Sequence, residues 1–257
     1  MFQLLPSAAV ATVIDKNWAV TASHCLILLL ENNFEKQPFE VVVNGFKNTI
    51  VNVAYPTACS VLDDVRNTYK KAIKEGQDVT SGVFLEPVLS KLSSLAGASD
   101  IALLQFANPV TDVEPLPLYD QQDEVGQKAI MLGWGAFSTG DKGIFDGEEN
   151  YDGCFRHTEN RISQIRNGML AFTFDRPSSK EVLPLEGVNG PGDSGGPLLL
   201  STSEGIKIAG VSSYSSCLTE ELDKQVEQGE RAMQLYDTIE HYARISDHVN
   251  WLRSIIN

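Results

Sequence analysis

Residues 187–199 read GVNGPGDSGGPLL, a run in which Ser194 stands among five glycines and two prolines. Glycine adopts backbone conformations that are closed to other residues, so the run predicts a tight turn that presents Ser194. Either the glycines serve an unusual turn and nothing else, or they clear space for a bound molecule and for backbone N–H groups that point at it. The rest of the chain decides between these interpretations.

The composition is that of a globular protein with an acidic surface. The chain has 257 residues, of which 42% are hydrophobic, and a formal net charge of −14. This acidic excess argues against nucleic acid or an anionic membrane as a partner. No apolar run approaches the roughly 18 residues that a membrane span requires, and no secretory leader is visible at the start of the sequence.

Short apolar segments separated by turn residues predict an all-β fold, either a barrel or a sandwich. The segments are rich in Val, Ile, Leu and Phe and are bounded by Gly, Pro, Asn or Asp. The predicted strands are residues 9–14, 18–21, 39–43, 49–54, 101–106, 128–132, 169–174, 197–200 and 206–212.

Four segments depart from this pattern and show helical spacing instead. Residues 60–75 and 87–95 repeat apolar side chains every three or four positions. Residues 219–233 form a polar, acidic and helix-like segment. Residues 246–256 carry one apolar face and predict a terminal helix that docks on the rest of the protein.

A nucleophilic serine requires a base that takes its proton and a third group that holds the base. His24 follows a predicted strand in WAVTASHC. Asp100 precedes another strand in SDIALLQF, where a carboxylate can be buried at a barrel rim. These two residues are therefore the candidate partners of Ser194. The histidines of the chain are His24, His157, His241 and His248.

Three blocks carry a family resemblance. TASHC around His24, SDIALL around Asp100 and GDSGGP around Ser194 resemble the catalytic blocks of the trypsin/chymotrypsin family, in that family's order. GWG at 133–135, GVSS at 210–213 and YARISDHVNWL at 242–252 are similar to the strand that opens the second barrel, the substrate-binding strand and the terminal helix. The resemblance implies two six-stranded antiparallel β-barrels with helical insertions and a C-terminal helix.

In such a fold the first barrel covers residues 1–112 and carries His24 and Asp100. A helical insert at about 60–96 separates the two residues in the sequence. We expect this insert either to limit access or bind a partner beside the active site, or to be a helical hairpin packed on the barrel.

The second barrel of such a fold covers residues 113–257 and carries Ser194. It would contain an insert at about 218–240 and the C-terminal helix at about 246–256. The two barrels together form one peptidase domain with the active site in the cleft between them.

The resemblance implies the chemistry of a serine endopeptidase. Ser194 would attack a peptide carbonyl, His24 would act as general base and then general acid, and Asp100 would fix the tautomer of His24. The backbone N–H groups of Gly192 and Ser194 would form the oxyanion hole. The substrate is then a peptide or protein, and neither a cofactor nor a metal is expected.

A second motif also fits the residues around Ser194. GDSGG matches G-x-S-x-G, the nucleophile elbow of α/β-hydrolases. That elbow follows a strand and precedes a helix, whereas PLEGVNGP precedes and PLLL follows here. We therefore reject this interpretation.

The beginning of the chain departs from the family pattern. In many members the ammonium of an N-terminal Ile or Val pairs with the Asp before the serine, here Asp193. Only 23 residues precede His24, and none of them forms an IVGG-like stretch. Either an N-terminal segment is missing from the sequence, or Asp193 has another partner. Otherwise the chain is an unactivated zymogen form or a catalytically silent binding or regulatory protein on a trypsin fold.

Four cysteines allow three disulfide pairings. We predict the pairs Cys25–Cys59 and Cys154–Cys217, and the family resemblance with the even count indicates a secreted or periplasmic protein. The cysteines form no C-x-x-C pair, which disfavours a zinc site. The acidic loop at 146–153 is either a calcium site or, as we favour, a solvated loop.

The substrate pocket differs from that of trypsin-like enzymes that cleave after basic residues. Those enzymes carry Asp six positions before the serine, where this chain has Val188. Glu240 takes another pocket-wall position, where it would either attract Lys and Arg or be solvated. Tyr214 either narrows the mouth of the pocket or is a packed aromatic residue. By the resemblance the pocket residues are Val188, Asn189, Ser212, Ser213, Tyr214 and Glu240.

Overall fold

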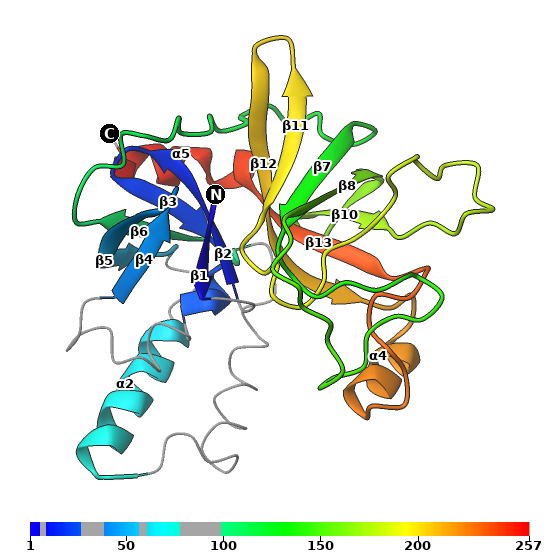
Figure 1. Cartoon of the computed structure of the whole chain (residues 1–257), viewed down its shortest axis with the longest axis horizontal. Helices are drawn as coiled ribbons and strands as arrows, with labels where there is room; N and C mark the ends of the chain where they lie inside the picture. Colours follow the sequence, from blue (N-terminus) through cyan, green and yellow to red (C-terminus); the bar gives the residue numbers. More distant parts are fainter. Residues whose placement is uncertain (6–8, 27–38, 57–60, 78–98, 257) are drawn as a thin grey trace.

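The structure is a computed structural model and describes residues 1–5, 9–26, 39–56, 61–77 and 99–256. Within these ranges the protein is built mainly of β-strands that form two barrel-like sheets beside each other (Figure 1). Loops, one 3₁₀ turn and three α-helices complete the described part of the chain.

The first sheet is a nearly closed barrel of six antiparallel strands. In spatial order its strands are β1 (Phe2–Leu5), β2 (Ala9–Asp15), β3 (Trp18–Thr21), β6 (Ala102–Phe106), β5 (Phe46–Ala54) and β4 (Phe39–Val43). The edge strands β1 and β4 contact each other, which nearly closes the barrel. Strand β4 alternates buried and exposed residues, as expected of a strand with one face on a core.

The second sheet is a half-barrel of seven antiparallel strands among the described residues, one more than predicted. In spatial order they are β8 (Arg156–Arg161), β7 (Lys128–Gly133), β11 (Pro197–Thr202), β12 (Gly205–Ser216), β13 (Ile239–Arg244), β10 (Met169–Thr173) and β9 (Gln164–Arg166). Strands β8, β9 and β13, and strand β1 of the first sheet, were not predicted. The all-β, chymotrypsin-like fold class is confirmed.

The helices lie where helical spacing predicts them, with changed ends. Helix α2 (Val61–Lys74) lies below the first sheet, and the backbone at Gly76 then turns left-handed with φ of 70° (Figure 1). Helix α4 (Glu220–Glu227) is shorter than the predicted 219–233. The predicted helix at 87–95 falls outside the described residues.

The C-terminal helix α5 (Ile245–Ile256) crosses from the second sheet to the first (Figure 1). Ile245 and Leu252 belong to the same buried cluster as the first sheet, and α5 also contacts β12. The end of the chain therefore ties the two sheets together. A second cluster fills the half-barrel around Phe172 and Tyr242, whose rings stack with centroids 5.6 Å apart.

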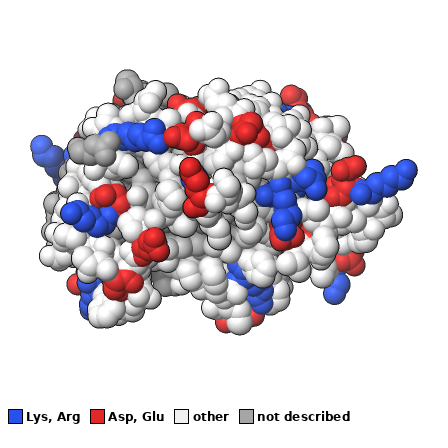
Figure 2. Space-filling view, turned by 90° about the horizontal axis from the view of Figure 1, so that it is seen from above, with Lys and Arg blue, Asp and Glu red and all other residues white. Residues whose placement is uncertain are grey.

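Charged side chains of both signs are interspersed on the face seen in Figure 2. Among the described residues, no helix has the length and apolar character needed to cross a membrane.

Candidate active site

Asp100 lies at the boundary between the two sheets, just before β6, and is fully buried. Its Oδ1 accepts hydrogen bonds from Ser23 Oγ at 2.7 Å and from the backbone N of His24 at 2.9 Å. Its Oδ2 contacts His24 Nδ1 at 2.7 Å and accepts from Ser213 Oγ at 2.6 Å. Burial opposes ionisation, yet the charge on His24 and the three side-chain hydrogen bonds lower the pKa of Asp100.

His24 lies in the 3₁₀ turn η1 (Ser23–Cys25) that follows β3. Its Nδ1 faces Asp100, and its Nε2 is 3.7 Å from Cys25 Sγ. Burial favours the neutral ring, but the charges and hydrogen bonds of Cys25 and Asp100 outweigh it and raise the pKa of His24 well above 6.5. The contact at Nδ1 therefore fixes the orientation of the imidazole, and the His24 side chain is partly exposed.

Ser194 lies in the turn before β11, against the first sheet. Its carbonyl oxygen accepts from the backbone N of Val10, on β2, at 2.8 Å. The backbone is left-handed at Gly192, with φ of 94°, and at Gly195, with φ of 79°, and a side chain at Gly195 would collide with Thr21. The glycines thus let the turn fit between the sheets.

The described residues offer no hydrogen-bond partner to the N–H groups of Gly192 and Ser194. Two unpaired donors beside a serine hydroxyl can receive an oxygen that gains negative charge. In the described part of the chain, Ser194 Oγ and His24 Nε2 are not hydrogen-bonded to each other.

Asp193 is held by backbone N–H groups. Its Oδ1 accepts from Gly135 N at 2.7 Å and its Oδ2 from Gly190 N at 3.1 Å, and Trp134 N contributes a further hydrogen bond. Burial raises the pKa of Asp193 despite these donors. No described Lys, Arg or His forms an ion pair with it. Among the described residues, the hydrogen-bond partners of the Asp193 carboxylate are therefore backbone N–H groups.

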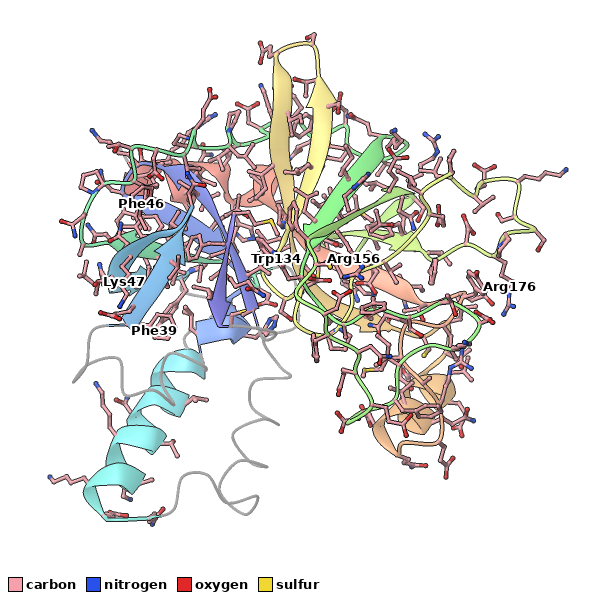
Figure 3. All side chains as sticks on the ribbon, in the orientation of Figure 1. Phe39, Phe46, Lys47, Trp134, Arg156 and Arg176 are labelled. Atoms are coloured by element: carbon pink, nitrogen blue, oxygen red, sulfur yellow. The ribbon has the colours of Figure 1, made fainter. Side chains whose placement is uncertain are left out.

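Two of the three N–H donors to Asp193, those of Trp134 and Gly135, come from the GWG segment at the end of β7. Figure 3 shows Trp134 near the centre of the molecule, with Arg156 beside it. A side chain at Gly133 or Gly135 would occupy the space of the Asp193 carboxylate. The sequence GWG thus provides two of the donors and the room for this carboxylate.

A cavity of about 330 Å³ opens beside Ser194. Five of the six predicted pocket residues line it with Ser194: Asn189, Ser212, Ser213, Tyr214 and Glu240. The sixth, Val188, lines a neighbouring cavity of about 510 Å³ and packs against the core of the second sheet. The position that carries the charge in trypsin-like enzymes therefore does not face Ser194 here.

The profile of the trypsin-like peptidase domain matches residues 9–206 of this chain. The chain belongs to the trypsin-like peptidase family. Among solved structures it is similar to neuropsin, a serine protease expressed in the limbic system of mouse brain. The two share 17% sequence identity and a TM-score of 0.58, over 96% of this chain and 88% of the other. No curated protein sequence matches the chain. Family and fold together support a protease-like function.

Sequence reasoning missed Ser23 as a site residue, and it predicted Ser213 for the substrate pocket but not for contact with Asp100. Ser23 and Ser213 both bind Asp100, and Ser213 does so because a bulge interrupts the pairing of β12 with β13 between Ser212 and Tyr214. Ser23 immediately precedes His24 in TASHC, and this adjacency was the sequence signal that could have identified it as a site residue. Asp146, Glu149 and Asp223 also line the cavity beside Ser194, although they are distant from it in the sequence.

The predicted disulfides are wrong. Cys25, Cys154 and Cys217 are free thiols, and Cys59 falls outside the described residues. Cys154 is exposed in a loop, whereas Cys217 is buried at the end of β12. Cys154 and Cys217 are thus not bonded to each other, and an even count of cysteines alone does not establish pairing.

The described residues contain no cluster of three His, Cys, Asp or Glu side chains suited to a metal ion. In the acidic loop Asp152 binds Arg156 through both carboxylate oxygens, at 2.7 Å each. Arg156 also lies 4.1 Å from the centre of the Phe137 ring. Part of the loop's negative charge is thus neutralised by a cation of the protein itself.

Proposed function

We propose that the protein is a serine endopeptidase that acts through Ser194, His24 and Asp100. The observation that supports this most directly is the buried Asp100 carboxylate, which holds His24 by its Nδ1 and is itself bound by Ser23 and Ser213. This arrangement leaves Nε2 as the basic atom of the ring, the atom that must take a proton from the nucleophile.

In the proposed reaction Ser194 Oγ forms a bond to the substrate carbonyl carbon while its proton passes to His24 Nε2. The carbonyl oxygen takes up negative charge between the N–H groups of Gly192 and Ser194. The C–N bond then breaks, and the proton passes from His24 to the departing amine. Water attacks the resulting ester with the same histidine as base, which releases the acid and restores Ser194.

One contact of His24 bears on the second candidate, a silent binding or regulatory protein on this fold. His24 Nε2 contacts Cys25 Sγ, and no hydrogen bond to Ser194 is described. Catalytic hydrogen bonds are often long in a free enzyme and tighten when substrate binds, so this contact does not by itself favour an inactive state. Labelling of Ser194 separates the two candidates.

A fluorophosphonate probe tests the proposal, because it forms a stable bond only with a serine that is activated by a base. We expect the probe to modify Ser194 in the wild-type chain and to leave Ser194→Ala unmodified. Mapping the cleavage sites in a mixed peptide library, with Ser194→Ala as the control, then gives the preferred substrate. A folded wild-type chain that neither takes up the probe nor cleaves any peptide would refute the proposal and favour the silent protein.

Location and partners outside the active site stay proposals. The family is often secreted or periplasmic, and we retain that location on this ground alone, because the described thiols are free. The insert at 60–96 is described only over 61–77, where α2 exposes Lys70, Lys71 and Lys74. A partner surface there is consistent with these exposed charges.

A further inference from the structure

The cavity beside Ser194 is lined by charged side chains of one sign only. Within the described part of the chain its lining contains four carboxyl groups and neither Lys nor Arg. These groups come from the loop that carries residues 146 and 149, from helix α4 and from strand β13, so their meeting at one cavity is a property of the fold. The four residues are Asp146, Glu149, Asp223 and Glu240.

Glu240 is the innermost of these carboxyl groups. It is 2% exposed, and its Oε1 accepts a hydrogen bond from Ser215 Oγ at 2.5 Å. Gln234 Nε2 donates to the same Ser215 oxygen at 3.1 Å. The carboxyl group is thus fixed in the cavity wall by a short chain of hydrogen bonds, and no described Lys or Arg forms an ion pair with it.

The surroundings of Glu240 favour its neutral form while the cavity is empty. Burial raises its pKa to about 8, the hydrogen bond from Ser215 opposes the rise, and the charge of Asp193 adds to it. On β10 its neighbour across the sheet is the apolar Phe172. Among the described residues, Asp193 and Tyr242 interact with its charge, and Asp146, Glu149, Cys217 and Asp223 share its cavity. Arg231 does not line the cavity but hydrogen-bonds Cys217.

Two further atoms in the same wall point to a polar ligand. Asn189 Nδ2 and Gln234 Oε1 are buried without a hydrogen-bond partner among the described residues, and both side chains line the cavity. A buried donor or acceptor without a partner costs free energy, so natural proteins rarely keep one without a function. An acceptor beside a carboxyl group suits a ligand that carries several N–H donors.

We propose that this cavity binds the cationic side chain of Lys or Arg before the scissile bond, with Glu240 on β13 as the charge partner and with binding coupled to loss of a proton from Glu240. The proposal rests on the proposed peptidase function. It assigns the selectivity for a basic side chain to Glu240 on β13. Val188, at the position that carries the charge in trypsin-like enzymes, lines the neighbouring cavity instead. Asp146, Glu149 and Asp223 add a field that attracts cationic substrates.

Binding of benzamidine, a small aromatic cation, tests the inference without any catalysis. Its affinity is measured by calorimetry on the Ser194→Ala chain, with the neutral and isosteric benzamide as the control ligand. Because the cation needs the ionised form of Glu240, we expect its Kd to fall about tenfold between about pH 7 and about pH 9. The Kd of benzamide should change by less than about twofold over the same range.

Glu240→Gln in the Ser194→Ala background removes the charge and retains the shape. We expect it to weaken benzamidine binding at about pH 9 by about tenfold or more and to abolish the pH dependence. Glu204→Gln, a change in the exposed turn between β11 and β12, is the matched control and should bind as the parent does. The pH titration of the parent gives a result even where Glu240→Gln fails to fold.

The outcomes separate this inference from the proposed function. A flat pH profile, or equal binding of benzamidine and benzamide, overturns the role of Glu240 even in a chain that reacts with a fluorophosphonate. Glu240-dependent binding of benzamidine in a chain that does not react with the probe supports the cation site and refutes the peptidase.

Discussion

Asp100 is the residue on which the proposed catalytic geometry depends most. Each of its carboxylate oxygens accepts two hydrogen bonds, and an amide in its place offers only one accepting oxygen. We expect Asp100→Asn to reduce kcat by about 10³- to 10⁴-fold, because His24 then adopts the wrong tautomer. Steady-state kinetics on a peptide substrate measures the loss. Asp112→Asn, an exposed change of the same type, should leave kcat unaltered.

The raised pKa of His24 determines the lower pH limit of the proposed reaction. The base is active when neutral, so activity is present above its pKa and is lost as the pH falls through it. We expect the acid limb of kcat/KM to lie above pH 6.5 in the wild type. It should move to lower pH in Asp100→Asn, which lacks the negative charge beside the ring. A pH profile that does not move contradicts the coupling of the two residues.

The carboxylate of Asp193 occupies the space that a side chain at position 135 would fill, so this position must be glycine. A Cβ at position 135 would lie 2.5 Å from Asp193 Cγ, so Gly135→Ala must displace the carboxylate and the turn that carries Gly192 and Ser194. We expect a loss in kcat of about 10² to 10³, the usual effect of one misplaced oxyanion donor. Ser203→Ala is the control, since Ser203 is exposed in the turn between β11 and β12. Equal activity of the two variants would show that the position of Asp193 is unimportant.

At the level of the elements, a buried ion pair between Glu124 and Arg244 stabilises the junction of β13 and α5. Glu124 is fully buried and binds Arg244 at 2.6 and 3.0 Å and Ser246 Oγ at 2.8 Å. Glu124→Ala leaves a buried guanidinium with only Asp247, at 3.3 Å, as its partner. We expect a loss of about 3 kcal/mol in the free energy of unfolding. Denaturant unfolding measures it, and Asp120→Asn, at an exposed pair with Arg253, should cost less than about 1 kcal/mol.

The elements also show what local sequence can and cannot predict. Strands β3 and β4 have the predicted bounds, because apolar residues between turn residues define them. Strand β13 was missed because IEHYAR is polar, although all six residues are buried. Its polar side chains bind Ser215, Ser216 and Glu124, which are distant in the sequence. A local pattern does not contain such partners.

In the candidate site too, local sequence predicts single residues but not the contacts between distant segments. His24, Asp100 and Ser194 each lie in a short block beside a strand end, so local motifs identify them. The cavity beside Ser194 combines residues from loops at 146–149 and 189–191 with β12, β13 and α4. The orientation of Val188 away from it follows from tertiary packing, which the spacing to Ser194 does not reveal.

At the scale of the whole molecule, the proposed active site lies where the two sheets meet. Ser213 of β12 binds Asp100, and the carbonyl of Ser194 binds Val10 of β2, so polar contacts as well as α5 join the sheets. Local opening of either sheet at this boundary would separate Ser194 from His24 before global unfolding. When the boundary between the sheets opens, we therefore expect the protein to lose the proposed activity at the same point as the contacts between the sheets.

The free thiols predict how the whole molecule responds to reduction. A disulfide typically adds about 2–4 kcal/mol, and its reduction would lower the unfolding temperature of a chain of this size by several degrees. We expect no such change on addition of a reductant, because Cys25, Cys154 and Cys217 are unpaired. A maleimide should modify Cys154 in the native protein and reach the buried Cys25 and Cys217 only after unfolding, as peptide mapping would report. A lower unfolding temperature after reduction would contradict the absence of disulfides. So would a Cys154 that the maleimide modifies only after the reductant is added. Either result would restore the argument from disulfides to a secreted protein.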